Sequence, residues 1–184
     1  MSQRYKVIDS SVPTFVTITI IDWVDLLIRP IYFEILDNSL NYCVAHKGLK
    51  IHAYVYMSSH IHMIVSSDVK ELSNIIRDFK KFTSKAFVEA IKEHPESRRE
   101  WLLNKFSYAA NRIKKGKHYK VWKDGFHPII LDNHEKIEQR VNYIHHNPVA
   151  SGLVYHERDW KNSSYVAYEE DNKEVPSVSL TLLW

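Results

Sequence analysis

The stretch LKIHAYVYMSSHIHMIVSS, residues 49–67, decides the fold because it contains two strand-like runs separated by a short polar pair. Side chains alternate along residues 49–57, and residues 60–67 form a second extended, largely apolar run. Serines favour turns, so Ser58 and Ser59 between the two runs predict a tight connection. The sequence therefore predicts a β-hairpin in this region.

Elements on both sides of the hairpin complete a β-α-β-β-α-(α)-β-α order. The remaining predicted elements are a strand over 15–21, helices over 31–48, 71–94, 98–117 and 134–147, and an extended segment over 119–131. Gly48 is the expected C-cap of the first helix. Pro148 is expected to end the last one. This order predicts an α+β fold of the ferredoxin-like (RRM-like) kind, an antiparallel sheet with helices packed mainly on one face and an additional C-terminal helix.

The helix over 71–94 has a predicted apolar face that packs on the sheet. Its members recur at helical spacing and are Leu72, Ile75, Ile76, Phe79, Phe82 and Ala86.

Composition indicates a globular, cytoplasmic protein. The chain has 184 residues, 45% of them apolar, which fits a single domain with a sizeable core. Its single cysteine, Cys43, excludes a disulfide framework and a cysteine zinc site, and it suggests a reducing compartment. No segment has the length of a membrane span, and the first residues lack an apolar signal core. We expect one domain over 1–168 and a tail over 169–184, which is a strand, an arm for a partner or partly disordered.

Two histidines interrupt the apolar run of the hairpin. His60 and His62 are two positions apart, so in a strand their side chains project to the same face, roughly 6–7 Å apart. Ile61 then points to the opposite face. One interpretation is a pair of polar residues on a solvent-exposed face. The other is a metal site, which needs a third ligand from elsewhere in the chain.

The predicted helix over 134–147 offers such a ligand together with a nucleophile. Tyr143 and Asn147 are four residues apart and share one helix face, which His146 also approaches while His145 points away. Taken singly, each has an ordinary structural interpretation. Together with the histidine pair they predict strand-transfer chemistry, in which a tyrosine attacks a DNA phosphodiester beside a divalent cation. The products are a phosphotyrosine and a free 3′-hydroxyl, and the reverse reaction rejoins DNA.

Four segments resemble a known family. YVYMSSHIHMIV (54–65) is similar to the His-hydrophobic-His motif of the HUH nucleases. VWKDGFHPIIL (121–131), VNYIHHNPVASGLV (141–154) and DWKNSSYVAY (159–168) resemble, in this order, the REP-associated tyrosine transposases, a branch of the single-tyrosine, insertion-sequence 200-like transposases. The resemblance runs from about Phe15 to Tyr168.

The resemblance implies an enzyme with a ferredoxin-like fold that cleaves and joins single-stranded DNA next to hairpins. Tyr143 would be the nucleophile that forms a 5′-phosphotyrosine, and His60, His62 and Asn147 would hold Mg or Mn. The partner would be single-stranded DNA with hairpin or inverted-repeat ends, and the protein would act as a monomer or homodimer, with no membrane involved. Three departures from the family pattern concern how the protein binds DNA. Ser58-Ser59 replaces a frequent Pro-Asn, Asp22-Trp23 replaces a polar Asn/Arg pair, and the section from His94 to Lys117 is longer than the resemblance implies.

Basic residues form two clusters that suit contacts with phosphates. The first lies along the helix over 71–94 and comprises Arg77, Lys80, Lys81 and Lys85. The second includes Arg112, Lys114 and Lys115. Both predict salt-dependent DNA binding, and the alternative for each is a solvated helix face. Trp122 and Phe126 are expected to pack in the core rather than to stack on bases.

Two further functions compete with the transposase. A ferredoxin-like sheet also serves as a non-catalytic DNA- or RNA-binding module. A small-molecule metallohydrolase would use His60 and His62 to hold zinc, but it needs a carboxylate as general base, and neither motif supplies one.

Overall fold

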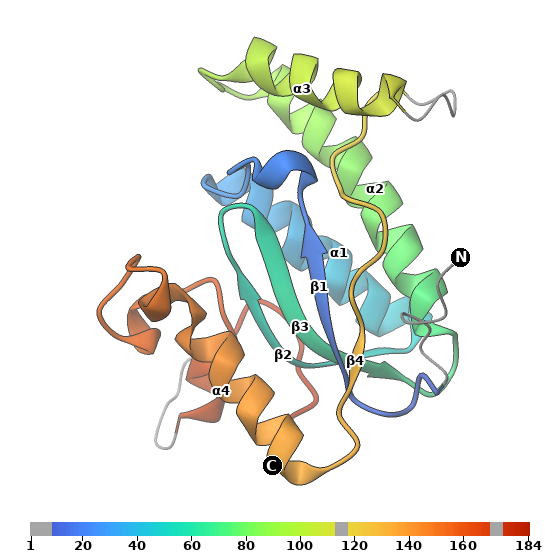
Figure 1. Cartoon of the computed structure of the whole chain (residues 1–184), viewed down its shortest axis with the longest axis vertical. Helices are drawn as coiled ribbons and strands as arrows, with labels where there is room; N and C mark the ends of the chain where they lie inside the picture. Colours follow the sequence, from blue (N-terminus) through green and yellow to red (C-terminus); the bar gives the residue numbers. More distant parts are fainter. Residues whose placement is uncertain (1–8, 113–117, 170–174) are drawn as a thin grey trace.

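A four-stranded antiparallel sheet forms the centre of the protein, in a computed structural model that describes residues 9–112, 118–169 and 175–184. The strands are β1 (Thr14–Thr19), β2 (Leu49–Tyr56), β3 (His60–Ser67) and β4 (Ile129–Ile130), in the spatial order β2-β3-β1-β4. The helices are α1 (Pro30–Lys47), α2 (Leu72–Glu93), α3 (Arg99–Asn111) and α4 (His134–Ala150). Element order and strand order together confirm the predicted ferredoxin-like fold (Figure 1).

The sheet is covered on both faces, by different helices. On one face, Val16, Ile18 and Ile61 join the larger core with α1 and α2. On the other, Phe15 and Ile64 pack with Val141, Ile144 and their neighbours of α4 in a smaller core. In Figure 1, α1 and α2 lie behind the sheet and α4 lies in front of it. The additional C-terminal helix that the sequence predicted is therefore the cover of the second face.

Double coverage explains the burial of the hairpin. Every residue of β3 after His60 is buried, including those that alternate onto the α4 face. Because side chains alternate along a strand, His60 and His62 share the α4 face with Ile64, while Ile61 points into the larger core, as predicted. His62 thus lies buried beneath α4 and not on an open face, whereas His60 is half-buried.

The first helix begins at Pro30, one residue before its predicted start, and ends at Gly48, the predicted C-cap. Pro30 occupies the first turn, where its missing N–H costs no hydrogen bond. Gly48 ends the helix with a φ of 71°, a left-handed conformation that favours glycine. A Cβ at Gly48 would lie 2.9 Å from side-chain atoms of Val69, so any larger residue would also crowd the chain that follows β3.

The buried face of α2 differs from the predicted one in its second half. Phe82 is 63% exposed, whereas Thr83 and Phe87 are buried. After Phe79 the buried positions recur every four residues, at Thr83, Phe87 and Ile91, so the buried face of the helix does not include Phe82. Thr83 is tolerated in the core because its Oγ1 donates to the Phe79 carbonyl and accepts a hydrogen bond of 2.9 Å from Trp122 Nε1. Trp122 itself is buried, which confirms its predicted role in packing.

The last helix begins as predicted and extends slightly further. The Asn133 side chain caps its start by accepting from the Lys136 amide at 2.9 Å. Pro148 does not end the helix, which continues to Ala150. A proline in the last turn removes only one intrahelical hydrogen bond, so the turn survives. Asn147 therefore keeps helical geometry relative to Tyr143.

The described part of the C-terminal tail docks on its own chain. Val178 is buried in the larger core, and the Thr181 amide donates to the Ile51 carbonyl at 2.8 Å. Trp184 packs against Tyr168 and against His134 at the start of α4. These residues form no strand, so the tail is an irregular, packed segment over 175–184. The domain boundary at 168 stays a prediction. Within the described residues no helix is long and apolar enough to span a bilayer.

Candidate active site

The two hairpin histidines lie side by side, with their ring centroids 4.7 Å apart. His62 is in register with Thr17 of β1 on one side and Val55 of β2 on the other. A hydrogen bond of 2.8 Å joins Thr17 Oγ1 and His62 Nδ1, and one of 3.2 Å joins Ser59 Oγ and His60 Nδ1. Holding Nδ1 in this way orients each ring and presents Nε2 as the atom that can bind a metal ion.

Both imidazoles are neutral at physiological pH. Burial lowers the pKa of His60, and it lowers the pKa of His62 to about 3, with further lowering from the charges of His60 and Arg140. A metal binds the neutral imidazole, so no proton has to be displaced at pH 7. The electrostatics of the pair thus fit a cation site.

Tyr143 of α4 lies against His62. Their ring centroids are 5.3 Å apart at an interplanar angle of 68°, and Phe15 also contacts the Tyr143 ring edge-on. Val141 and Ile144 on the same helix are buried against the sheet, which fixes the helix in this position. Tyr143 is nevertheless 43% exposed, so its ring touches His62 while remaining open to a substrate.

Asn147 lies one helical turn after Tyr143 and is half-buried. Residues four apart on a helix share a face, so both project from the same side of α4. Among the described residues, no three His, Cys, Asp or Glu side chains form a metal-binding group. The role of the Asn147 amide oxygen as the third ligand beside His60 and His62 stays a prediction.

Arg140 is a candidate that the sequence reading did not single out. Its guanidinium lies 4.9 Å from the Phe15 ring centroid and 5.6 Å from that of Tyr143. It precedes Tyr143 by three residues, and this spacing is the signal that could have identified it. A cation at this position favours negative charge on a bound phosphate or on the tyrosine oxygen.

The two histidines between Tyr143 and Asn147 anchor the helix. His145 is buried and bonded to Ser164 Oγ at 2.9 Å, and burial lowers its pKa to about 4. It points away from the site, as predicted. His146 is bonded through Nδ1 to Glu157 at 2.8 Å. Both tie α4 to the segment that follows it.

Asp22 and Trp23 have an unusual backbone beside His60. Their φ angles are 50° and 57°, in the left-handed region that non-glycine residues rarely adopt. Such a conformation costs about 1–3 kcal/mol per residue and persists where surrounding contacts enforce it, often at functional sites. The Trp23 ring lies 5.3 Å from the His60 ring.

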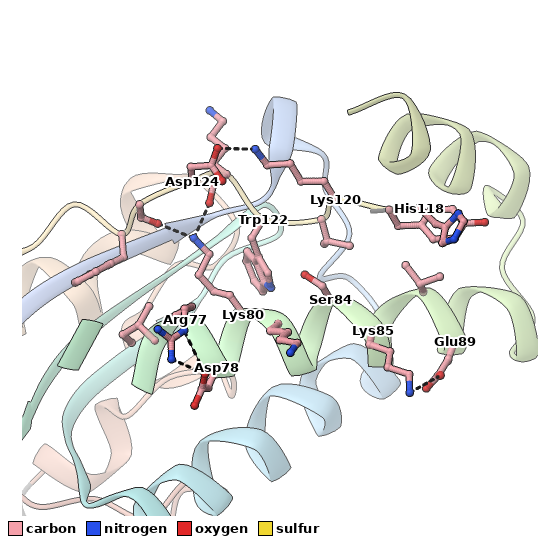
Figure 2. Close-up of a pocket in the computed structure, with 18 of the residues that line it drawn as sticks. Arg77, Asp78, Lys80, Ser84, Lys85, Glu89, His118, Lys120, Trp122 and Asp124 are labelled. Atoms are coloured by element: carbon pink, nitrogen blue, oxygen red, sulfur yellow. Dashed lines mark hydrogen bonds and ion pairs between the residues drawn. The ribbon is translucent and has the colours of Figure 1, made fainter. Parts of the chain in front are cut away.

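A basic groove of about 1390 Å³ lies between α2 and residues 118–126. All four predicted DNA-binding residues of α2, namely Arg77, Lys80, Lys81 and Lys85, line it. In Figure 2, Lys80 reaches from α2 toward the segment that carries Lys120, Trp122 and Asp124. Its Nζ donates to the carbonyls of Lys123 at 2.6 Å and Gly125 at 2.7 Å, so Lys80 joins the two walls.

Part of the second predicted cluster lies beside this groove. Arg112 lines a smaller hollow of about 310 Å³ together with Lys120 and Lys123, and both lysines also line the larger groove. Lys114 and Lys115 lie outside the described residues. DNA binding by either cluster stays a prediction.

Part of the chain matches the sequence model of a known family. Residues 28–115, slightly less than half of it, match the family described as "Transposase IS200 like". The matched segment contains His60 and His62 and ends before α4. A comparison with curated protein sequences found no significant match.

Among solved structures, the chain is similar in fold to a REP-associated tyrosine transposase bound to a REP hairpin. The TM-score is 0.65 at 17% identity, with 99% of each chain covered, so the shared fold includes the region of α4. A bacterial tRNA(His) guanylyltransferase-like protein in complex with ATP gives a TM-score of 0.41 at 11% identity, covering 92% of this chain and 72% of that one. This second likeness is too weak to bear on function.

Proposed function

We propose that this chain, whose family match and fold support its assignment to the IS200-like transposases, is a metal-dependent enzyme that cleaves and rejoins single-stranded DNA next to hairpins. The observation that carries the proposal is the contact between Tyr143 and His62, at 5.3 Å between ring centroids, beside the His60–His62 pair. A partly exposed tyrosine thus lies against a buried imidazole, with a second imidazole beside it.

In the proposed cleavage step, the Tyr143 hydroxyl oxygen attacks a DNA phosphorus and the bond to the 3′-oxygen breaks. The tyrosine oxygen gives up its proton and becomes bonded to the 5′-phosphate, and the released 3′-oxygen takes up a proton to become a free hydroxyl, so no net proton is gained or lost. Attack by a 3′-hydroxyl of another strand end reverses the step, restores the tyrosine and joins the DNA. No external energy source is needed, because one phosphodiester replaces another.

The side chains around Tyr143 have separate proposed roles. His60, His62 and Asn147 would hold Mg or Mn, which when bound supplies polarisation of the phosphate and stabilisation of developing charge. Arg140 places a guanidinium beside the tyrosine, where it favours the negative charge of the attacked phosphate. Thr17 and Ser59 orient the imidazoles.

The test is formation of a covalent protein–DNA adduct. The substrate is a single-stranded oligonucleotide that carries the inverted repeats flanking the gene, incubated with Mg or Mn and resolved by denaturing electrophoresis. We expect an adduct with the native protein and none with Tyr143→Phe, although the variant still binds the DNA. Tyr155→Phe, at an almost fully exposed tyrosine of the same region, is the matched control and should react normally.

Two results would overturn the proposal. An adduct that persists in Tyr143→Phe would exclude Tyr143 as the nucleophile. DNA binding without any adduct, in the presence of either cation, would favour the alternative of a non-catalytic binding module.

A further inference from the structure

Trp23 is an exposed aromatic residue at the edge of the candidate site. Its side chain is 56% exposed, although its ring lies edge to face against the ring of His60. Its neighbours Ile21 and Val24 are each 5% exposed and supply the packing of this turn. The core therefore does not require a large ring at position 23, and most of the ring is open to a ligand.

The backbone holds Trp23 in place. The Ile21 amide donates to the Val121 carbonyl at 2.8 Å, and the Trp23 amide donates to the Ile20 carbonyl at 3.2 Å. The Asp22 carboxylate pairs with Lys105 of α3 at 3.1 Å. Hydrogen bonds and an ion pair on both sides thus support the left-handed conformation at residues 22 and 23.

A lysine lies over this ring and connects it to the basic groove. Lys123 Nζ is 4.6 Å from the Trp23 ring centroid, and Lys123 also lines the groove between α2 and residues 118–126. Its amide donates to the Thr19 carbonyl at 2.8 Å, next to the pair that Thr19 forms with His60. A single DNA strand that runs from the groove toward the histidines would therefore pass Lys123 and Trp23.

We infer that Trp23 and Lys123 form a nucleotide subsite, in which one base of single-stranded DNA stacks on the exposed part of the Trp23 ring and Lys123 contacts an adjoining phosphate. The inference rests on the proposed function and adds the element that places the strand beside His60. An indole face stacks on any base, so this contact favours single-stranded over paired DNA without selecting a sequence. The contacts of the ring with His60 and Lys123 keep it in position before DNA arrives.

The test measures binding without cleavage, in buffer that contains EDTA and no divalent cation. The probes are a fluorescein-labelled dT15 oligonucleotide and an equally labelled oligonucleotide of the same backbone with abasic sites in place of the bases. Fluorescence anisotropy measures the binding of each probe. Trp23→Ala should weaken binding of dT15 roughly tenfold, the size expected for one lost base–aromatic stack. Binding of the abasic probe should stay unchanged, and Trp23→Phe should retain most of the affinity.

Two controls keep the result specific. Trp101→Ala removes a tryptophan of similar exposure, 50%, on α3 and should leave both affinities unchanged. Trp23→Asn replaces the ring with a residue that tolerates positive φ, so it gives the same answer if the alanine variant fails to fold.

The phosphate contact of Lys123 is tested separately. Lys123→Ala should weaken the binding of both probes, because a phosphate contact does not depend on the base.

Equal binding of dT15 by the native protein and both ring-removing variants would overturn the inference, as would equal losses for dT15 and the abasic probe. Neither result depends on covalent chemistry. A base-specific loss in Trp23→Ala supports the subsite even where Tyr143 forms no adduct, and a normal adduct with no base-specific loss rejects the subsite alone.

Discussion

The rings of His62 and Tyr143 lie 5.3 Å apart, although one residue belongs to the hairpin and the other to the last helix. The contact is made within one chain, because α4 packs across the same face of the sheet that carries the histidines. A single copy of the protein thus contains the histidine pair and the tyrosine together.

We therefore predict that the site acts in cis. Mixing Tyr143→Phe with His62→Ala should give no covalent adduct with hairpin DNA, because neither chain has both the tyrosine and an intact histidine pair. Adduct recovered in the mixture, beyond the sum of the two variants alone, would mean that α4 of one copy serves the site of another.

Thr17 should matter for metal affinity through His62. Thr17→Val removes the hydroxyl that holds His62 Nδ1, and losing such a partner typically lowers metal affinity about 10–100-fold. Titration with Mn, followed by electron paramagnetic resonance, measures this without any DNA. Thr14→Val on the same strand is the control, since Thr14 Oγ1 donates to the Val12 carbonyl instead. Unchanged Mn affinity in Thr17→Val would show that the bond does not support a metal site.

Arg140→Ala should slow formation of the covalent adduct about 10²-fold, as expected when a preorganised charge at the reacting group is lost. DNA affinity should change much less, because the guanidinium faces Tyr143 and Phe15. Single-turnover rates at saturating DNA separate the two effects. Lys136→Ala, on the same helix but paired with Asp132, should react at the native rate. A pure loss of affinity in Arg140→Ala would contradict a role in the chemical step.

Glu96 should make stability depend on acid pH. Burial disfavours its charge, but hydrogen bonds from Arg29, the Arg98 amide and Tyr32 outweigh it and lower its pKa to about 2, from an ordinary 4.5. The unfolded chain binds the proton first, so the stabilising contribution is complete above pH 4.5 and is lost as pH falls toward 2. Glu96→Gln should lower the free energy of unfolding at pH 7 by about 2 kcal/mol and flatten its decline between pH 4.5 and 2.

Urea unfolding at several pH values measures both effects of Glu96→Gln. The control is Glu89→Gln, at an exposed carboxylate paired with Lys85, which should change stability by less than about 0.5 kcal/mol. A pH profile of Glu96→Gln parallel to that of the native protein would mean that Glu96 is not the group responsible.

Two adjacent lysines of α2 should behave differently. Lys81 is exposed in the groove, so Lys81→Ala should weaken DNA binding and reduce the slope of log K against log salt by about one, with no change in melting temperature. Lys80 bonds to the carbonyls of Lys123 and Gly125, so Lys80→Ala should lower the melting temperature. The reverse pattern would mean that Lys80, not Lys81, contacts phosphate.

The sequence by itself determined the features that depend on near neighbours. Alternation over 49–67 gave the hairpin, and its period of two placed His60 and His62 on one face. Gly48 and Asn133 marked helix ends because capping is a local matter of backbone geometry and side-chain hydrogen bonding. Tyr143 and Asn147 shared a face for the same kind of reason, the pitch of one helix.

Only the tertiary structure decided which of these faces meet. The packing of α4 over the second face of the sheet brought Tyr143 to His62 and buried this histidine, which the hairpin alone would leave in solvent. The same packing placed Arg140 beside Tyr143, and the run of residues 118–126 beside α2 buried Thr83 in place of Phe82. These outcomes depend on contacts between residues far apart in the chain. Local periodicity carries no information about such contacts, because they arise from how complete elements pack against one another.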